Sequence, residues 1–329
     1  MQSFDLDYLI NEKSKKYGEI LQSGKSNVFT FNAEQHKNFS YCIQQHCPFL
    51  SLINLFPVPF STGKKIIGTL APYITGRQEN GRNIAFPQAN NDYYQLVETD
   101  SGFLIPWQLF DQFAFMKENF EQLYDNIIFN QIGLDMLQIG WNGHTVAINT
   151  SSKDLSDVNK GWLTLLKEQK PENFKSKGKH GDTVKIFGED ADFTDLNKLA
   201  IYLRQRLDIH HQQRNDLVFL VGIDLLAHSP GPILENSMMA EHSALNNRYL
   251  LNTFGGLKTF TPPNFPPKGA CVTTLNNLSI YTVENSGRYS IRNDEDRQGI
   301  ITSYYREQGY VIEDLGLISA IDHNNVILN

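Results

Sequence analysis

The chain has 329 residues, of which 40% are hydrophobic and 20% charged, and its formal net charge is -7 at pH 7. These proportions are those of a globular protein, so they argue against a disordered or fibrous chain, and the length suits two domains better than one. The acidic balance argues against a protein that coats nucleic acid through its own surface, because such binding relies on clustered Lys and Arg.

The start of the chain and its cysteines add two further exclusions. Residues 1–19 are polar and charged without an apolar signal core, and no stretch reaches about 18 uninterrupted apolar residues. Cys42, Cys47 and Cys271 give an odd number, which suits a reducing compartment and not a disulfide framework. We therefore expect no secretion signal, no membrane partner and no disulfides.

The first part of the chain carries little secondary-structure signal. Residues 1–50 are polar and weakly periodic, which predicts an extended arm with one short helix over 8–17. The apolar run that follows, over 50–70, is strand-like and is interrupted by Pro57, Pro59 and Gly63.

A long hairpin is expected next, over 66–103. Its two sides, 66–75 and 93–104, are rich in β-branched and aromatic residues, and the polar segment between them contains Asn80-Gly81, a pair typical of tight turns. A two-stranded ribbon is marginal in water and must lie on something else. Its support could be a neighbouring subunit or its own domain, and the segment does not decide between them.

The strongest helical pattern begins at Pro106, a favourable first-turn residue, and runs to Ile139. At about 1.5 Å per residue, roughly 30 residues would span about 45 Å, so the helix is either a strut or an ordinary core helix. Asp125 belongs with the charged residues of its expected wet face. Apolar residues at steps of four and three mark the opposite face: Leu109, Phe113, Met116, Phe120, Leu123 and Ile127.

From residue 153 the pattern changes to alternating helices and strands. Helices are expected over 161–169, over 196–207 with Asp192 or Thr194 as the cap, and over 223–227, and a buried strand over 217–222. We take 153–269 as an inserted α/β domain that ends at the stiff, proline-rich stretch TPPNFPP. The tail then returns to strands at 278–283, 288–292, 299–307 and 310–321. The pattern as a whole indicates an α+β protein.

The leading metal candidate is the pair His210 and His211 with Asp208. Neighbouring histidines at the end of a helix point in different directions, and a positive charge there suits the helix dipole. We therefore expect no metal at this position.

Other candidate chemistry is equally incomplete. The glycine-rich stretches GWNG and TFGGLK lack the Lys-Ser/Thr ending of a phosphate-binding loop, and no nucleophile elbow occurs. Glu241 and His242 have no nucleophile beside them in sequence. The lysines of KSKGKHGD are most simply a solvated loop. A cysteine and histidine set matches no usual zinc spacing: Cys42, Cys47, His36 and His46. We assign no catalytic, cofactor-binding or metal-binding residue.

Several stretches, weak one by one, form an ordered set: FLSLINLFPVPFSTGKKIIG, LDMLQIGWNG with GWLTLLKEQ, DLVFLVGIDLLA, and LNNLSIYTVENSGRYSI leading into YVIEDLGLISAI. From about Val28 onward, this set resembles the P2-type tailed bacteriophage major capsid proteins, in the same order and with similar gaps. The resemblance implies the HK97-like phage capsid fold. The implied parts are an N-terminal arm over 1–50, a peripheral domain over 51–65 and 104–152 that carries the long spine helix, an extended loop over 66–103, an axial domain over 153–269, and a return to the peripheral sheet over 270–329.

The resemblance also implies a function without catalysis or cofactor. The chain would assemble with its copies into pentamers and hexamers of an icosahedral head shell around double-stranded DNA, without sequence-specific contacts to that DNA. Scaffolding protein, portal and cement proteins are the other implied partners. The chain would assemble in the cytoplasm of the host bacterium and reside in the virion. The extended loop would cross a neighbouring subunit, which makes its tip the candidate contact: Arg77, Glu79, Asn80, Gly81, Arg82 and Asn83.

Two departures and two alternatives accompany this interpretation. The segment before Val28 is shorter than expected of the family, so proteolytic removal of an N-terminal portion is not expected. Lys64 or Lys65 could serve a covalent cross-link between subunits, but no specific motif matches. The alternatives are an encapsulin-like nanocompartment shell with a cargo enzyme, and a metal-dependent enzyme centred on His210 and His211.

Overall fold

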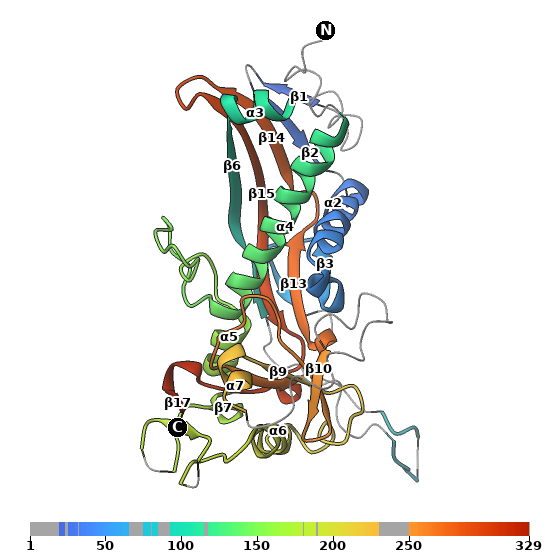
Figure 1. Ribbon diagram of the computed structural model, residues 1–329. Helices are drawn as coiled ribbons and strands as arrows, with labels where there is room; N and C mark the ends of the chain where they lie inside the picture. Colours follow the sequence, from blue (N-terminus) through green and yellow to red (C-terminus); the bar gives the residue numbers. More distant parts are fainter. Residues whose placement is uncertain are drawn as a thin grey trace. The chain divides into compact units, whose positions relative to one another are not determined.

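The computed structural model describes residues 20–23, 26–31, 33–65, 75–79, 81–84, 93–114, 118–179, 181–188, 190–229 and 250–328 (Figure 1). The chain divides into two compact units, each assembled from three segments of sequence. The first unit comprises Met1–Gly63, Gln95–Met136 and Ile280–Tyr310, and the second comprises Lys64–Tyr94, Leu137–Ser279 and Val311–Asn329. Helices and strands occur in both units, which confirms the α+β class.

A seven-stranded sheet forms the frame of the first unit. Its order is β1-β2-β14-β15-β13-β3, and β6 adds to β15. β15 pairs antiparallel with both β14 and β6, and its β-branched and aromatic residues suit a packed, pleated surface. The strands are β1 (Ile20–Ser23), β2 (Ser26–Thr30), β3 (Asn54–Val58), β6 (Val97–Pro106), β13 (Leu278–Val283), β14 (Arg288–Asp294) and β15 (Gly299–Ile312).

Aromatic rings join the helices of the first unit to this sheet. The helices are α2 (Ala33–His46), the 3-10 helix η1 (Pro48–Leu52), α3 (Trp107–Ala114) and α4 (Glu118–Asn142). The ring of Phe39 on α2 lies 5.1 Å from Phe129 on α4 and 4.5 Å from Tyr304 on β15, between ring centroids. Such contacts add to the free energy of burial, by about 0.5–1.5 kcal/mol for each pair.

The expected arm over 1–50 is wrong for its second half. β2 is a strand of the sheet, and Phe31, Phe39, Ile43 and Cys47 are buried. The last three residues lie four apart, so Phe39 and Ile43 share one face of α2 and Cys47 follows directly after the helix, a stripe that the polar residues around it conceal in the sequence. The helix expected over 8–17 lies outside the described residues.

The spine helix is present, but its expected start and buried face are wrong. Pro106 ends β6, so helical structure begins at Trp107, and α4 continues to Asn142. Leu123 and Ile127 are 38% and 49% exposed, whereas Asp125, expected in water, is 5% exposed. Apolar residues occupy more than one face of α4, so periodicity alone cannot choose the buried one. Packing against the sheet chooses it: Tyr124, Ile128, Phe129 and Ile132 are buried.

The hairpin expected over 66–103 is also different in the structure. β6 pairs with β15 along its whole length, from Pro106 opposite Gly299 to Val97 opposite Gln308. A separate two-stranded sheet joins β4 (Thr62–Lys64) to β5 (Tyr93–Gln95). The side over 93–104 is therefore mostly part of the first unit's sheet, and residues 66–74 lie outside the described part of the chain.

The second unit is built on a six-stranded sheet in the order β10-β11-β9-β12-β16-β7, and β17 pairs with β8 in a sheet of two. All four residues of β9 are buried, as expected for a central apolar strand. The strands are β7 (Phe174–Lys175), β8 (Val184–Ile186), β9 (Val218–Val221), β10 (Leu250–Phe254), β11 (Leu257–Phe260), β12 (Ala270–Thr273), β16 (Ser319–Ile321) and β17 (Val326–Leu328).

Three helices expected in this region are present: α5 (Trp162–Gln169), α6 (Leu196–Gln205) and α7 (Ile223–Ala227). The cap of α6 is Asp195, whose side chain accepts a hydrogen bond from the Lys198 N–H, in place of Asp192 or Thr194. The end of the expected axial domain is wrong. β12, β16 and β17 belong to the second unit, because β12 pairs with the buried strand β9 and β16 pairs with β12.

Acid should destabilise the first unit through His36. This side chain is 2% exposed, and burial, together with the charge of Arg306, lowers its pKa to about 4. Because an unfolded His has a pKa near 6.5, protonation favours the unfolded state, and the free energy of unfolding should fall by about 3 kcal/mol between pH 6.5 and pH 4. Denaturant unfolding of unassembled protein across this range measures the loss.

The matched variants are His36→Gln, which cannot protonate, and His228→Gln at an exposed histidine. The first should flatten the pH dependence of stability and the second should leave it as it is. An unchanged slope in His36→Gln would contradict the assignment.

Candidate assembly surfaces

The tip of the extended loop is described at 75–79 and 81–84, and every residue of these two ranges is exposed. Gly81 has a φ of +98°, in the left-handed region that glycine adopts without strain. The two sides of the loop approach each other at Gly76, where an added Cβ would lie 2.9 Å from Cγ of Asn83. Asn80 lies outside the described residues.

The charged side chains of this tip are available to other molecules. Arg77 and Arg82 are exposed, as is Glu79, and none of the three forms an ion pair with another residue that the structure describes. The predicted contact residues that the structure describes are thus all exposed, and whether a second subunit meets them stays a prediction.

A second exposed feature is the α4–β6 surface, defined as Phe103, Leu123 and Ile127, of which sequence periodicity assigned Leu123 and Ile127 to the buried face of the helix. Phe103 on β6 is 39% exposed and lines the same cavity as Ile127, with a volume of about 130 Å³. Leu123 lies one helical turn from Ile127 on the same face of α4. Exposed apolar side chains that gather around a cavity are typical of a surface that another protein covers.

Polar groups also line this cavity. Asp135 and Tyr304 line it, and the Tyr124 hydroxyl is hydrogen bonded to Thr302 at the same place. Burial raises the pKa of Asp135, an effect that the charge of Arg306 opposes. The cavity is therefore lined by both apolar and polar side chains.

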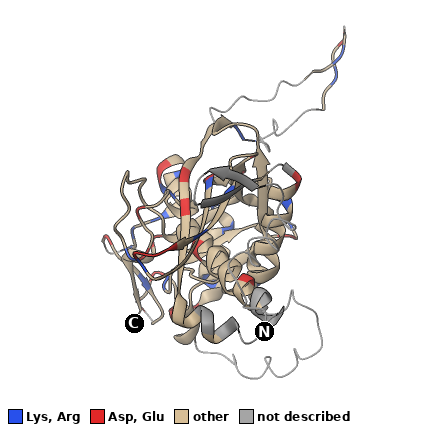
Figure 2. Cartoon of the chain, turned by 90° about the horizontal axis from the view of Figure 1, so that it is seen from above, with Lys and Arg blue, Asp and Glu red and all other residues tan. Residues whose placement is uncertain are grey.

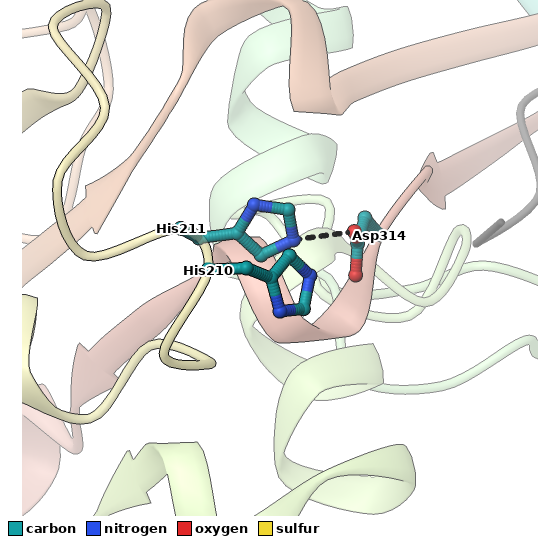
Figure 3. Close-up of side chains that lie close together, drawn as sticks. All are labelled: His210, His211 and Asp314. Carbon is teal, nitrogen blue, oxygen red and sulfur yellow. Dashed lines mark hydrogen bonds and ion pairs between the residues drawn. The ribbon is translucent and has the colours of Figure 1, made fainter. Parts of the chain in front are cut away.

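The histidine pair lies beside a different carboxylate from the one expected (Figure 3). Nε2 of His211 donates to Oδ2 of Asp314 at 2.8 Å, and the ring of His210 lies 3.9 Å from that of His211, between centroids. Asp208 instead forms an ion pair with Lys170 at 2.8 Å. Sequence reasoning missed Asp314 because it is distant in the sequence, after β15.

The structure does not bring together the cysteine and histidine set. His46 bonds the Cys42 carbonyl oxygen and Oδ1 of Asn126, at 2.7 Å and 2.6 Å. Cys47 is buried, which raises the pKa of its thiol to about 11. His36 lies in the aromatic core, and among the described residues only the His210 cluster groups three potential metal ligands. Glu241 and His242 lie outside the described part.

Helices in the described part of the chain include none that is long and apolar enough to cross a membrane. Figure 2 shows Lys and Arg interspersed with Asp and Glu along the described chain.

Comparison with known proteins places this arrangement in a family. The model of the phage major capsid protein, P2 family, matches residues 7–324. The chain belongs to this family. The match begins nearer the N-terminus than the Val28 expected from the sequence alone. This capsid protein is 26% identical to the capsid proteins of Escherichia phage P2 over 309 residues, 88% of this chain and 85% of the relative. It is also 26% identical to the major capsid protein of Serratia phage KSP20, over 85% and 84% of the two chains.

Solved structures confirm the HK97-like fold. A chain of the satellite phage P4 procapsid that includes the size determination (Sid) protein has a TM-score of 0.75 at 21% identity, covering 100% of this chain and 98% of that one. The cyanophage A-1(L) capsid has a TM-score of 0.50 at 11% identity, covering 83% and 91%. Membership of the family supports the capsid interpretation over the encapsulin-like alternative. The role of this capsid protein is structural.

Two adjacent isoleucines of α4 test which face of the helix is buried. Ile127 is 49% exposed and Ile128 is 6% exposed. Ile127→Ser should change the free energy of unfolding by less than about 0.5 kcal/mol, since surface substitutions are close to neutral. Ile128→Ala should lower it by about 2–5 kcal/mol, because it leaves a cavity against the sheet. Chemical denaturation of the two variants compares them, and equal losses would contradict the assigned face.

Proposed function

We propose that copies of this major capsid protein form the pentamers and hexamers of an icosahedral head shell that encloses double-stranded DNA. The family match over residues 7–324 carries this proposal. Head-to-tail contacts between identical subunits close into rings when the rotation between neighbours permits, so one chain can build both kinds of ring. The chain would supply the wall and no catalytic step.

The contacts are proposed to use two chemically different surfaces. The loop tip offers exposed charges, Arg77, Glu79 and Arg82, that can pair with polar groups of a neighbour. The α4–β6 surface offers apolar area whose burial contributes about 25 cal/mol per Å². Polar contacts fix orientation and apolar burial supplies free energy, so the two complement each other.

The remaining partners follow from the same role. A scaffolding protein would guide curvature, a portal would occupy a special position, and cement proteins could brace the finished shell. The net charge of -7 fits a wall that touches DNA without sequence-specific contacts and does not hold its phosphates tightly. Assembly is proposed to occur in the cytoplasm of the host bacterium, before the protein becomes part of the virion.

Assembly itself is the first test. The full chain, expressed alone and together with the scaffolding protein of a P2-like phage, should give rings, sheets or closed shells, because head-to-tail contacts between its copies are proposed to close. Size-exclusion chromatography and negative-stain microscopy detect these products. A strictly monomeric product under both conditions would overturn the proposal.

Removal of 77–83 tests the loop tip. The variant should keep the unfolding midpoint of the parent, because these side chains contribute nothing to the described core, and it should fail to form closed shells. A second variant replaces 77–83 by seven Gly and Ser residues, which restores length without the charged and amide side chains, and it should also fail. Normal shells from either variant would show that the tip makes no essential contact, whereas loss of folding would favour a loop packed on its own subunit.

A further inference from the structure

His210, His211 and Asp314 form a cluster of ligand-type side chains for which shell formation has no evident use. One ring nitrogen from each histidine and one carboxylate oxygen of Asp314 all lie within 4.8 Å of one another. Figure 3 shows both rings on the same side of the carboxylate, which contradicts the expectation that neighbouring histidines diverge. We propose that the three side chains bind one divalent transition-metal ion, with Zn²⁺ as the best-suited ion.

The spacing fits this ion after a small adjustment. Zn²⁺ binds imidazole nitrogen and carboxylate oxygen at about 2.0–2.2 Å, so two ligands of a tetrahedral site lie about 3.4 Å apart. Nε2 of His211 and Oδ2 of Asp314 are 2.8 Å apart, so they need to separate by about half an ångström. His210 is exposed and can turn its ring toward the other two ligands. Three protein ligands leave a fourth position for water.

The carboxylate is held in place before any ion binds. Oδ1 of Asp314 accepts a hydrogen bond from the Gly316 N–H at 2.7 Å, which leaves Oδ2 to face the histidines. The backbone of Asp314 bonds the side chain of Asn277 twice, at 2.8 Å and 2.9 Å, and Asn277 is 2% exposed. Outer partners of this kind orient a ligand and strengthen its affinity for metal.

The cationic side chains Arg214 and Lys170 form hydrogen bonds with other carboxylates, so they do not occupy Oδ2 of Asp314. Arg214 is paired with Asp216 through two hydrogen bonds of 2.9 Å and 2.6 Å, and Lys170 is paired with Asp208. In the described part of the chain, Asp314 forms its ion pair with His211 alone, while Arg214, whose charge also acts on Asp314, gives its hydrogen bonds to Asp216. Two neutral imidazoles and one carboxylate are a common ligand set for zinc.

A bound ion would join two segments of the second unit that are far apart in the sequence. His210 and His211 lie in the connection between α6 and β9, and Asp314 caps the 3-10 helix η6 (Leu315–Leu317) that follows β15. Because the cluster forms only in the folded chain, an ion bound there stabilises the fold. The inferred role is structural, which separates it from the metal-dependent enzyme considered from the sequence.

Equilibrium binding of Zn²⁺ to the metal-free full chain, followed by calorimetry and by metal analysis after gel filtration, tests the site. We expect one ion per chain and a rise in the unfolding midpoint when Zn²⁺ is added. Affinity should fall as the pH is lowered, because protons compete for the same imidazole nitrogens. Absence of binding, or an unchanged midpoint, would overturn the proposal.

The variants His210→Ala and Asp314→Asn separate the ion site from a simple hydrogen bond between His211 and Asp314. Each should lower Zn²⁺ affinity at least about tenfold, the smallest loss expected when even an outer partner of a ligand is removed. His210 is exposed and Asn can retain the cap at 314, so both variants should fold. His228→Ala, at an exposed histidine outside the cluster, should bind as the parent does. Equal affinity in His210→Ala and the parent, or loss in His228→Ala alone, would indicate adventitious surface binding and overturn the site.

Discussion

The buried guanidinium of Arg306 is the constraint on which the packing of the first unit depends. Arg306 is 1% exposed on β15, and a buried charge must have hydrogen-bond partners to be tolerated. It donates to Oε1 of Gln308 at 3.0 Å and to Oγ of Ser101 on β6 at 2.9 Å, and it lies 4.7 Å above the Tyr304 ring centroid. A shift in the register of β6 against β15 would remove the Ser101 partner, so the charge and the register require each other.

The same requirement determines which side of α4 faces water. The sheet beside Arg306 presents aromatic rings and Thr302, and α4 meets it with Tyr124, Ile128 and Phe129. Once those side chains are buried, Leu123 and Ile127 point away from the core and remain 38% and 49% exposed. The exposure of the α4–β6 surface is thus a consequence of which side chains of α4 pack against the sheet. Its exposed area is unfavourable in an isolated subunit and becomes favourable when a neighbour covers it.

Local sequence signals identified some elements and misplaced others, for physical reasons. β9 and α6 were predictable, because an unbroken apolar run and a stripe of leucines indicate buried elements whatever their partners are. The partner of β6 could not be predicted. It is β15, near residue 300, and no local pattern encodes a pairing across that distance in the sequence. The buried face of α4 was predicted wrongly, because apolar residues occupy more than one face of this helix. The third member of the ligand cluster was not predicted, because Asp314 approaches the histidines only when the chain has folded.

The two proposed contact surfaces also differ in the free energy that each contact contributes and in how closely the two subunits must fit. The charged side chains of the loop tip gain little from any single neighbour, since exposed ion pairs contribute only about 0–1 kcal/mol each. Weak contacts can dissociate and form again, so a misplaced subunit can be corrected while a shell is growing. The apolar surface around the cavity contributes more free energy and demands a closer fit. Many such contacts on each subunit then act together, so that a closed shell is stable although each single contact is modest.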